Sequence, residues 1–162
     1  MLARAITFAL VGLEPRRVEA EAHVRDAVPA FILVGLVDRA CQEAKHRVRT
    51  SIRAAHLRWP GKCIVNLAPA ELKKEGSGFD LPIALALLAA SQQLPRSALE
   101  RTAAVGELAL DGRLRGVGGV LAVAEGARRA RSCPRTSARS SSLWRGFPLP
   151  WTTSGASASP RR

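Results

Sequence analysis

Residues 65–84 place a short apolar strand, a charged turn and a nearly all-apolar helix directly after one another. Pro82 fits the first turn of a helix, where its missing N–H costs little, and Asp80 is a natural N-cap. Residues 83–90 are apolar on almost every side, so we expect the most buried helix of the fold there. The turn before it contains two glycines, and it can gather a hydroxyl, backbone N–H groups and charges at one edge of a sheet.

The rest of residues 1–130 alternates between strand and helix patterns. Residues 17–24 alternate apolar and polar side chains, as in a strand buried on one face, and we expect them to pair with residues 5–11 across a turn near residues 13–15. The apolar run 31–34 is typical of a strand buried on both faces. The other predicted elements are a helix from its N-cap Asp38 with the apolar face Cys41, Ala44, Val48, Ile52 and Ala55, a strand at 62–67, strands at 104–110 and 113–117 around a two-residue Asp111-Gly112 turn, and a helix at 118–130. This order predicts an α/β (α+β) fold, a two-layer sandwich of a mixed sheet with helices on one face.

Residues 131–162 differ in composition from the rest of the chain. They are rich in Arg, Ser and Pro, contain no acidic residue, and show no period of strand or helix. We therefore expect a largely disordered basic tail. It is either a nucleic-acid-binding tail or, as we favour, the product of a frameshift near residue 131 in a GC-rich gene, which would leave the protein truncated. Resequencing the locus decides between them, and a downstream frame without a one-base slip would contradict the second.

Positive charge is the main pointer to a partner, because the formal net charge is +12. Lys45, Arg49 and Arg53 are four residues apart and form a basic ridge on the predicted helix, opposite its apolar face. Such a ridge can contact phosphates, although a solvated helix face explains it as well. Lys73 and Lys74 are expected to be solvated in the charged turn, and they complete the set of candidate DNA contacts.

Several kinds of site are excluded by their motifs. Gly61-Lys62 is followed by Cys63, and His56 stands where the first glycine of a Walker A motif belongs, so no ATP site is recognisable. The histidines and cysteines lack metal-ligand spacing, and the cysteines show no disulfide pattern, which favours a reduced, cytoplasmic setting. No apolar run approaches the roughly 20 residues that span a bilayer. We expect no metal, no cofactor and no membrane partner for these residues.

The chain resembles the N-terminal domain of the magnesium-chelatase-like AAA+ ATPases of the YifB/ComM group. The matching stretches are Pro29-Ala30-Phe31, Val34-Gly35-Leu36 with Asp38, Arg47-Val48-Arg49, Val65-Asn66-Leu67-Ala68-Pro69-Ala70, Lys74-Glu75-Gly76-Ser77, Phe79-Asp80-Leu81-Pro82-Ile83-Ala84-Leu85, Gly106-Glu107-Leu108 and Leu110-Asp111-Gly112. The chain departs from the family where Val37, Gly116 and Ala122 replace an expected proline. The resemblance implies an AAA+ motor after this domain, with ATP, Mg²⁺ and hexamer neighbours belonging to that motor, and a link to DNA branch migration in natural transformation.

The resemblance also implies a fold similar to the Lon proteolytic domain and to the RadA C-terminal domain, which raises a Ser-Lys peptidase as a hypothesis. A serine nucleophile needs a base within hydrogen-bond reach. The nucleophile position of Lon maps onto Gly78, with Ser77 one step early, and its lysine position maps onto Leu121. This mapping leaves neither position with the side chain that a Ser-Lys peptidase needs. If the purified chain cleaved casein, and Ser77→Ala abolished the cleavage, that interpretation would be wrong. We therefore expect no catalytic residue in this chain.

The charged turn is then expected to have a structural role. Ser77 and Asp80 are predicted to cap the buried helix, Asn66 to tie its strand end to a neighbouring turn, and Glu107 to do the same beside the hairpin. The residues that carry the family signature here are Asn66, Pro69, Gly76, Ser77, Asp80, Pro82, Glu107, Asp111 and Gly112. Two functions remain open, a non-catalytic accessory domain of a DNA-linked AAA+ ATPase and a stand-alone nucleic-acid-binding module.

Overall fold

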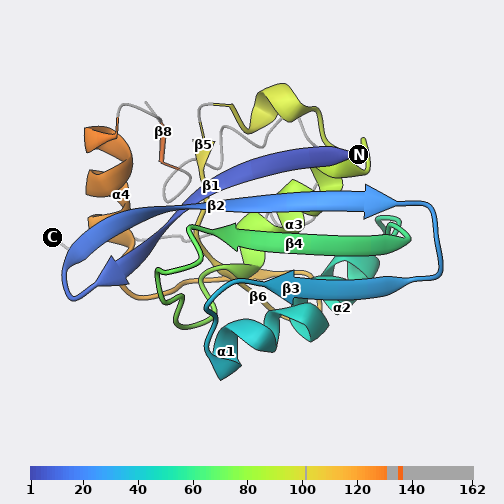
Figure 1. Cartoon of the computed structure of the whole chain (residues 1–162), viewed down its shortest axis with the longest axis horizontal. Helices are drawn as coiled ribbons and strands as arrows, with labels where there is room; N and C mark the ends of the chain where they lie inside the picture. Colours follow the sequence, from blue (N-terminus) through green and yellow to red (C-terminus); the bar gives the residue numbers. More distant parts are fainter. Residues whose placement is uncertain (101, 131–134, 137–162) are drawn as a thin grey trace, which may run out of the picture.

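The computed structural model of the chain describes residues 1–100, 102–130 and 135–136. Its main sheet has the strand order β3-β4-β2-β1-β5-β8 and is mixed, because β1 and β2 pair antiparallel whereas β3 runs parallel to β4. Figure 1 shows strands β2 and β4 of this sheet in front of α3. The strands of the main sheet are β1 (Leu2–Val11), β2 (Glu14–Arg25), β3 (Ala30–Val34), β4 (Lys62–Ala68), β5 (Thr102–Ala103) and β8 (Arg135–Thr136). The tail predicted for residues 131–162 lies outside the described residues, apart from 135 and 136.

The other elements form the helical layer and a small second sheet. They are α1 (Arg39–Gln42), α2 (Ala44–Ala54), α3 (Asp80–Ala90), the 3₁₀ helix η1 (Arg96–Ala98), the strands β6 (Glu107–Leu108) and β7 (Leu114–Arg115), and α4 (Val120–Arg129). The result is the predicted two-layer α/β arrangement. No helix within the described residues has the length and apolar character needed to cross a bilayer.

The β1–β2 hairpin confirms the pairing expected from the alternation in residues 17–24. Ala3 lies opposite Ala22 and Ala5 opposite Ala20, and all four side chains are buried in the main core. These small side chains let α3 lie close to the sheet. The turn is earlier than predicted, at residues 12–13, because residues 14 and 15 already belong to β2.

Helix α3 is the centre of the core, and all of its residues from 80 to 90 are buried. The predicted apolar face of the preceding helix is also confirmed, since Cys41, Ala44, Val48 and Ile52 are inaccessible and pack in the same cluster. That helix is divided at Glu43 into α1 and α2. The two apolar helices together cover the sheet, and their burial supplies the main driving force for folding.

Strand β3 differs from its prediction, because it lies at the edge of the sheet and not in its interior. Only Leu33 in this strand is buried, whereas Ile32 and Val34 keep 41% and 47% of their surface exposed. A run of apolar residues carries no information about strand order. The expectation of burial on both faces was therefore wrong.

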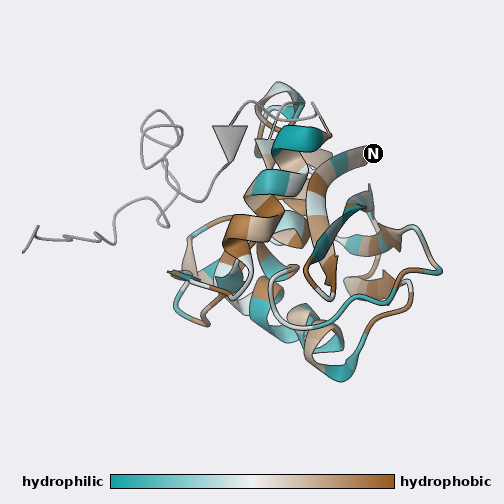
Figure 2. Cartoon of the chain, turned by 90° about the vertical axis from the view of Figure 1, so that its left-hand side faces the viewer, coloured by the Kyte–Doolittle hydropathy of each residue, from teal (hydrophilic) through white to brown (hydrophobic). Residues whose placement is uncertain are grey.

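Helix α4 packs at the hairpin end of the sheet in a second, smaller cluster. Val123 and Ala127 contact Phe8 and Ala103 there. Arginines on the opposite side of α4 are exposed, and the ribbon of this amphipathic helix is banded in brown and teal in Figure 2. In the β6–β7 hairpin the Ala109 N–H donates to the Arg113 carbonyl, and three residues lie between these two. The predicted turn had two residues. Gly112 is the turn residue with a positive φ, of +86°.

Candidate functional site

The turn between β4 and α3 is fixed by the segment that follows β3. The Lys74 N–H donates to the Leu36 carbonyl at 2.8 Å, and the Asp38 N–H donates to the Lys74 carbonyl at 3.0 Å. The turn begins at the cis peptide bond between Ala68 and Pro69. The turn therefore runs beside the segment that leads from β3 into α1.

Asp38 joins this turn to the helical layer with its two carboxylate oxygens. One oxygen accepts the Cys41 N–H at 2.7 Å, which confirms Asp38 as the predicted N-cap. The other accepts the Gly76 N–H at 3.0 Å, and Gly76 has a φ of +83° that glycine adopts without steric cost. The second bond was not expected from the sequence, because nothing in the sequence pattern brings residues 38 and 76 together.

Lys74 is buried, with no exposed surface, and its ammonium donates to the Pro69 carbonyl. Burial lowers the pKa of this lysine. The expectation that Lys74 is solvated and contacts DNA was therefore wrong, because its backbone pairs with residues 36–38 and places the side chain under the turn. Lys73 stays two-thirds exposed, and its ammonium lies 2.5 Å from the Glu75 carboxylate.

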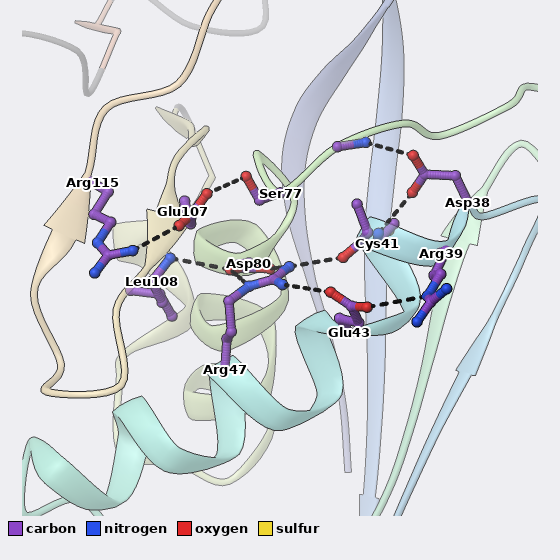
Figure 3. Close-up of polar contacts among 12 residues, drawn as sticks. Asp38, Arg39, Cys41, Glu43, Arg47, Ser77, Asp80, Glu107, Leu108 and Arg115 are labelled. Carbon is purple, nitrogen blue, oxygen red and sulfur yellow. Dashed lines mark hydrogen bonds and ion pairs between the residues drawn. The ribbon is translucent and has the colours of Figure 1, made fainter.

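Arg47 and Asp80 form a buried ion pair between α2 and α3, which Figure 3 shows at the centre of the polar contacts. The Arg47 Nε and Nη2 atoms lie 2.6 and 2.9 Å from the two Asp80 oxygens. Nη2 also donates to the Ala40 carbonyl at 2.9 Å, and the Leu108 N–H donates to Asp80 at 3.1 Å. The ion pair thus joins four segments, with α2, α3 and β6 meeting at the Asp80 carboxylate and α1 bonded to the Arg47 guanidinium. Burial raises the pKa of Asp80, against the opposing effect of the Arg47 hydrogen bonds.

This ion pair replaces the predicted capping role of Asp80. Asp80 is the first residue of α3, the N-cap is Phe79, and no side chain caps the helix. Arg47, unlike the arginines of the basic ridge, is largely shielded from solvent, because only 19% of its side chain is exposed. The sequence carried one usable signal: Arg47 lies three residues after Ala44 and four before Ser51, both buried, so it lies on their side of α2.

Ser77 and Glu107 connect the turn to the second sheet. The Ser77 hydroxyl donates to the Glu107 carboxylate and does not cap α3 as predicted. Arg115 on β7 lies 3.4 Å from the same carboxylate, which Figure 3 shows between its two partners. The Ser77 hydrogen bond lowers the pKa of Glu107. The two lysines of the turn have other partners: Lys73 contacts Glu75, and Lys74 donates to the Pro69 carbonyl.

The hydrogen bond from Ser77 to Glu107 predicts a change in the pKa of Glu107 that can be measured. In Ser77→Ala the pKa of Glu107 should rise toward the ordinary glutamate value, because its main stabilising donor is removed. The lowered pKa means that ionised Glu107 stabilises the fold above its unfolded-state pKa, and that this contribution is lost as the pH falls through the folded-state pKa. Carboxyl ¹³C NMR titration measures the change, with the exposed Ser97→Ala as control. An unchanged pKa in Ser77→Ala would contradict the assignment.

The remaining signature residues lie close to this turn or in the hairpin. The Asn66 amide donates to Glu21 on the neighbouring strand β2 at 3.2 Å, so it ties two strands together and not a strand to a turn as expected. Pro82 is buried in the first turn of α3. Asp111 accepts the Arg113 N–H at 3.0 Å within the hairpin, and the Gly112 N–H donates to the Ala109 carbonyl.

The predicted basic ridge lies on the outer side of α2. Arg49 and Arg53 are exposed and Lys45 is half-buried. The Arg49 guanidinium lies 5.8 Å from the ring centre of Trp59, which itself contacts Phe31. A cavity of about 450 Å³ lies here, and Arg25, Arg58 and Trp59 are among the residues that line it. No group of three or more His, Cys, Asp or Glu side chains suited to a metal occurs among the described residues.

Comparison with known proteins identifies relatives of this chain. A family model described as subunit ChlI of Mg-chelatase matches residues 20–133. The chain is 45% identical over 131 residues to competence protein ComM of Haemophilus influenzae, and 47% identical over 130 residues to YifB of Salmonella typhimurium. In both cases the match covers 80% of this chain but 26% of the relative. The chain therefore spans about a quarter of the length of these relatives.

Proposed function

This chain belongs to the family described as subunit ChlI of Mg-chelatase, and we propose that it acts in the cytoplasm as a non-catalytic accessory domain of a ComM- or YifB-type AAA+ ATPase and contacts DNA. The observation that carries the proposal is the match of 80% of the chain to competence protein ComM. In this proposal ATP and Mg²⁺ are bound by an AAA+ motor domain outside these residues. That motor domain and its hexamer neighbours are the protein partners.

The basic ridge of α2 is the surface that we assign to DNA. Lys45, Arg49 and Arg53 follow one another by one helical turn, so their charges lie along one line on the surface. Cationic side chains in such a line bind the phosphate backbone without reading its sequence. Trp59 lies beneath Arg49 and limits the directions that its guanidinium can take. The surface is thus suited to nucleic acid of any sequence.

The charge of the ridge gives a direct test. Replacing Lys45, Arg49 and Arg53 by glutamine should weaken binding of the full chain to duplex and branched DNA, and it should lower the salt slope by about 0.9 for each phosphate that the protein no longer neutralises. Fluorescence anisotropy from low to high salt measures both quantities. The control is Arg16, Arg96 and Arg129→Gln, which removes equal charge from other exposed positions. An equal weakening in the two triple variants would contradict a specific role for the ridge.

The accessory role is tested separately from DNA binding. We would exchange the matched region of Haemophilus ComM for that of this chain and ask whether the chimera restores competence in a strain without ComM. The proposal predicts that the chimera is active and that the ridge triple variant is not. DNA binding by the isolated chain together with an inactive chimera would instead support the stand-alone nucleic-acid-binding module.

A further inference from the structure

Within the described part of the chain, no strand pairs with the outer backbone edge of β1 over its second half. The Ala104 N–H donates to the Ile6 carbonyl, and β1 pairs with β5 only at Ile6. Because backbone groups alternate in direction along a strand, the N–H and C=O groups of Phe8 and Leu10 point to the same side as those of Ile6, away from β2. Pro15 on β2 lies opposite Leu10 and has no N–H to donate. This fits a Leu10 carbonyl that points away from β2. No described residue meets the edge-facing groups of Phe8 and Leu10.

The chain that could have continued the sheet turns away at this point. After Ala104 the next backbone bond is from the Gly106 N–H to the Gly78 carbonyl at 3.0 Å, on the turn before α3. A wedge therefore opens between β1 and that turn. Phe8 is only 5% exposed, so its edge-facing amide lies where an unpaired backbone group is costly.

This wedge is a cleft of about 640 Å³, within the range of about 300–1,000 Å³ that ligand pockets occupy. One wall is the β1 edge, a second is the turn 76–78, and a third is the segment 116–118. The second and third walls are rich in glycine and leave their backbones accessible.

The charge of the cleft is opposite to that of the whole protein. Among the described residues that line it, Glu75 and Glu107 are the only ionisable ones, in a chain of formal net charge +12. Their partners Lys73 and Arg115 are about two-thirds exposed and lie toward solvent. A cationic ligand side chain can therefore compete with the exposed Arg115 for Glu107.

We propose that this cleft binds an extended peptide segment with a lysine or arginine side chain, which adds as a strand to the β1 edge at Phe8 and Leu10 while its cation contacts Glu107. Backbone pairing supplies affinity, and Glu107 supplies the preference for a cationic residue. This binding is distinct from the contact with DNA, because the ridge of α2 does not line the cleft.

One pair of variants isolates the backbone edge. Leu10→Ala and Leu10→Pro both remove the leucine side chain, but only proline removes the edge-facing N–H and covers it with a ring. The N–H of residue 10 takes no part in the β1–β2 ladder, and proline is tolerated at such edge positions. We therefore expect both variants to keep the fold by circular dichroism and both to bind DNA as the wild type does.

The probe is a fluorescein-labelled peptide of about eight residues, with alternating valine and threonine and one central arginine, bound to the full chain. Leu10→Pro should bind it about tenfold more weakly than Leu10→Ala. Replacing the peptide's arginine by glutamine should weaken binding to the wild type but not to Glu107→Gln. Equal affinity in the two Leu10 variants, or no binding by the wild type, would overturn the proposal.

A second measurement needs no protein variant and decides the question if Leu10→Pro unfolds. Two isomers of the peptide carry N-methyl groups on alternate sets of residues. A strand added to the β1 edge uses the N–H groups of only one set, so one isomer should fail to bind and the other should still bind. If both isomers bind as the unmodified peptide does, no strand is added and the proposal is wrong.

Discussion

Arg47→Met should destabilise the fold by about 3–5 kcal/mol, the cost of leaving one partner of a buried ion pair uncompensated. Asp80 has no exposed surface, and the Arg47 guanidinium supplies two of its hydrogen bonds. Methionine keeps most of the apolar length of arginine, so the destabilisation comes from the carboxylate and not from a cavity. Urea unfolding followed by circular dichroism measures the change in the free energy of unfolding.

Two further variants make this prediction specific. Arg47→Met combined with Asp80→Asn should be more stable than Arg47→Met alone, because asparagine carries no charge and still offers an oxygen to the Leu108 N–H. Arg53→Met, on the exposed side of the same helix, should change stability by less than about 0.5 kcal/mol. If Arg47→Met were as mild as Arg53→Met, the ion pair would have no structural role.

Leu87→Ala should cost about 2–5 kcal/mol, because it opens a cavity in the middle of the core. Leu87 has no exposed surface, and all the remaining residues of its helix, α3, are buried as well. A helix enclosed on all sides has no direction from which its neighbours can collapse into the space. We therefore expect the destabilisation to fall in the upper half of that range, as measured by thermal or urea unfolding.

The control is the same substitution at an exposed leucine. Leu121 on α4 keeps 85% of its surface exposed, so Leu121→Ala should be within about 0.5 kcal/mol of the wild type. Leu87→Met, which conserves volume, should cost less than about 1.5 kcal/mol. Similar destabilisation by Leu87→Ala and Leu87→Met would mean that cavity formation does not explain the effect.

The parts of the fold that the sequence predicted well are those in which local pattern and burial coincide. The alternation in residues 17–24 predicted β2 and its buried face, and the all-apolar segment 83–90 predicted the buried helix α3. The edge position of β3 could not be predicted, because its apolar residues are the same whichever strands lie beside it. Strand order depends on pairing between distant segments, which no local period contains.

The candidate site was predictable only in outline. The sequence placed Asp38 correctly as an N-cap, because that preference is local. It placed Asp80 and Ser77 wrongly, because a local preference for capping does not show distant partners. Asp80 binds Arg47 and Ser77 binds Glu107, each more than twenty residues away along the chain. Lys74 was misplaced because lysine is rarely buried, and only the backbone pairing of the turn shows where its side chain goes.

The bonds that shape the turn before α3 have a consequence for the order of folding. Gly76 is held by a residue 38 positions away, Ser77 by one 30 positions away, and Asp80 by one 33 positions away. Loop-closure entropy opposes contacts over such separations until other interactions have brought the segments together. The turn should therefore form late, after α2 and the β6–β7 hairpin have docked on α3. The signature residues of the turn, Pro69, Gly76 and Ser77, thus lie in a segment whose structure is imposed by the rest of the domain and does not nucleate it.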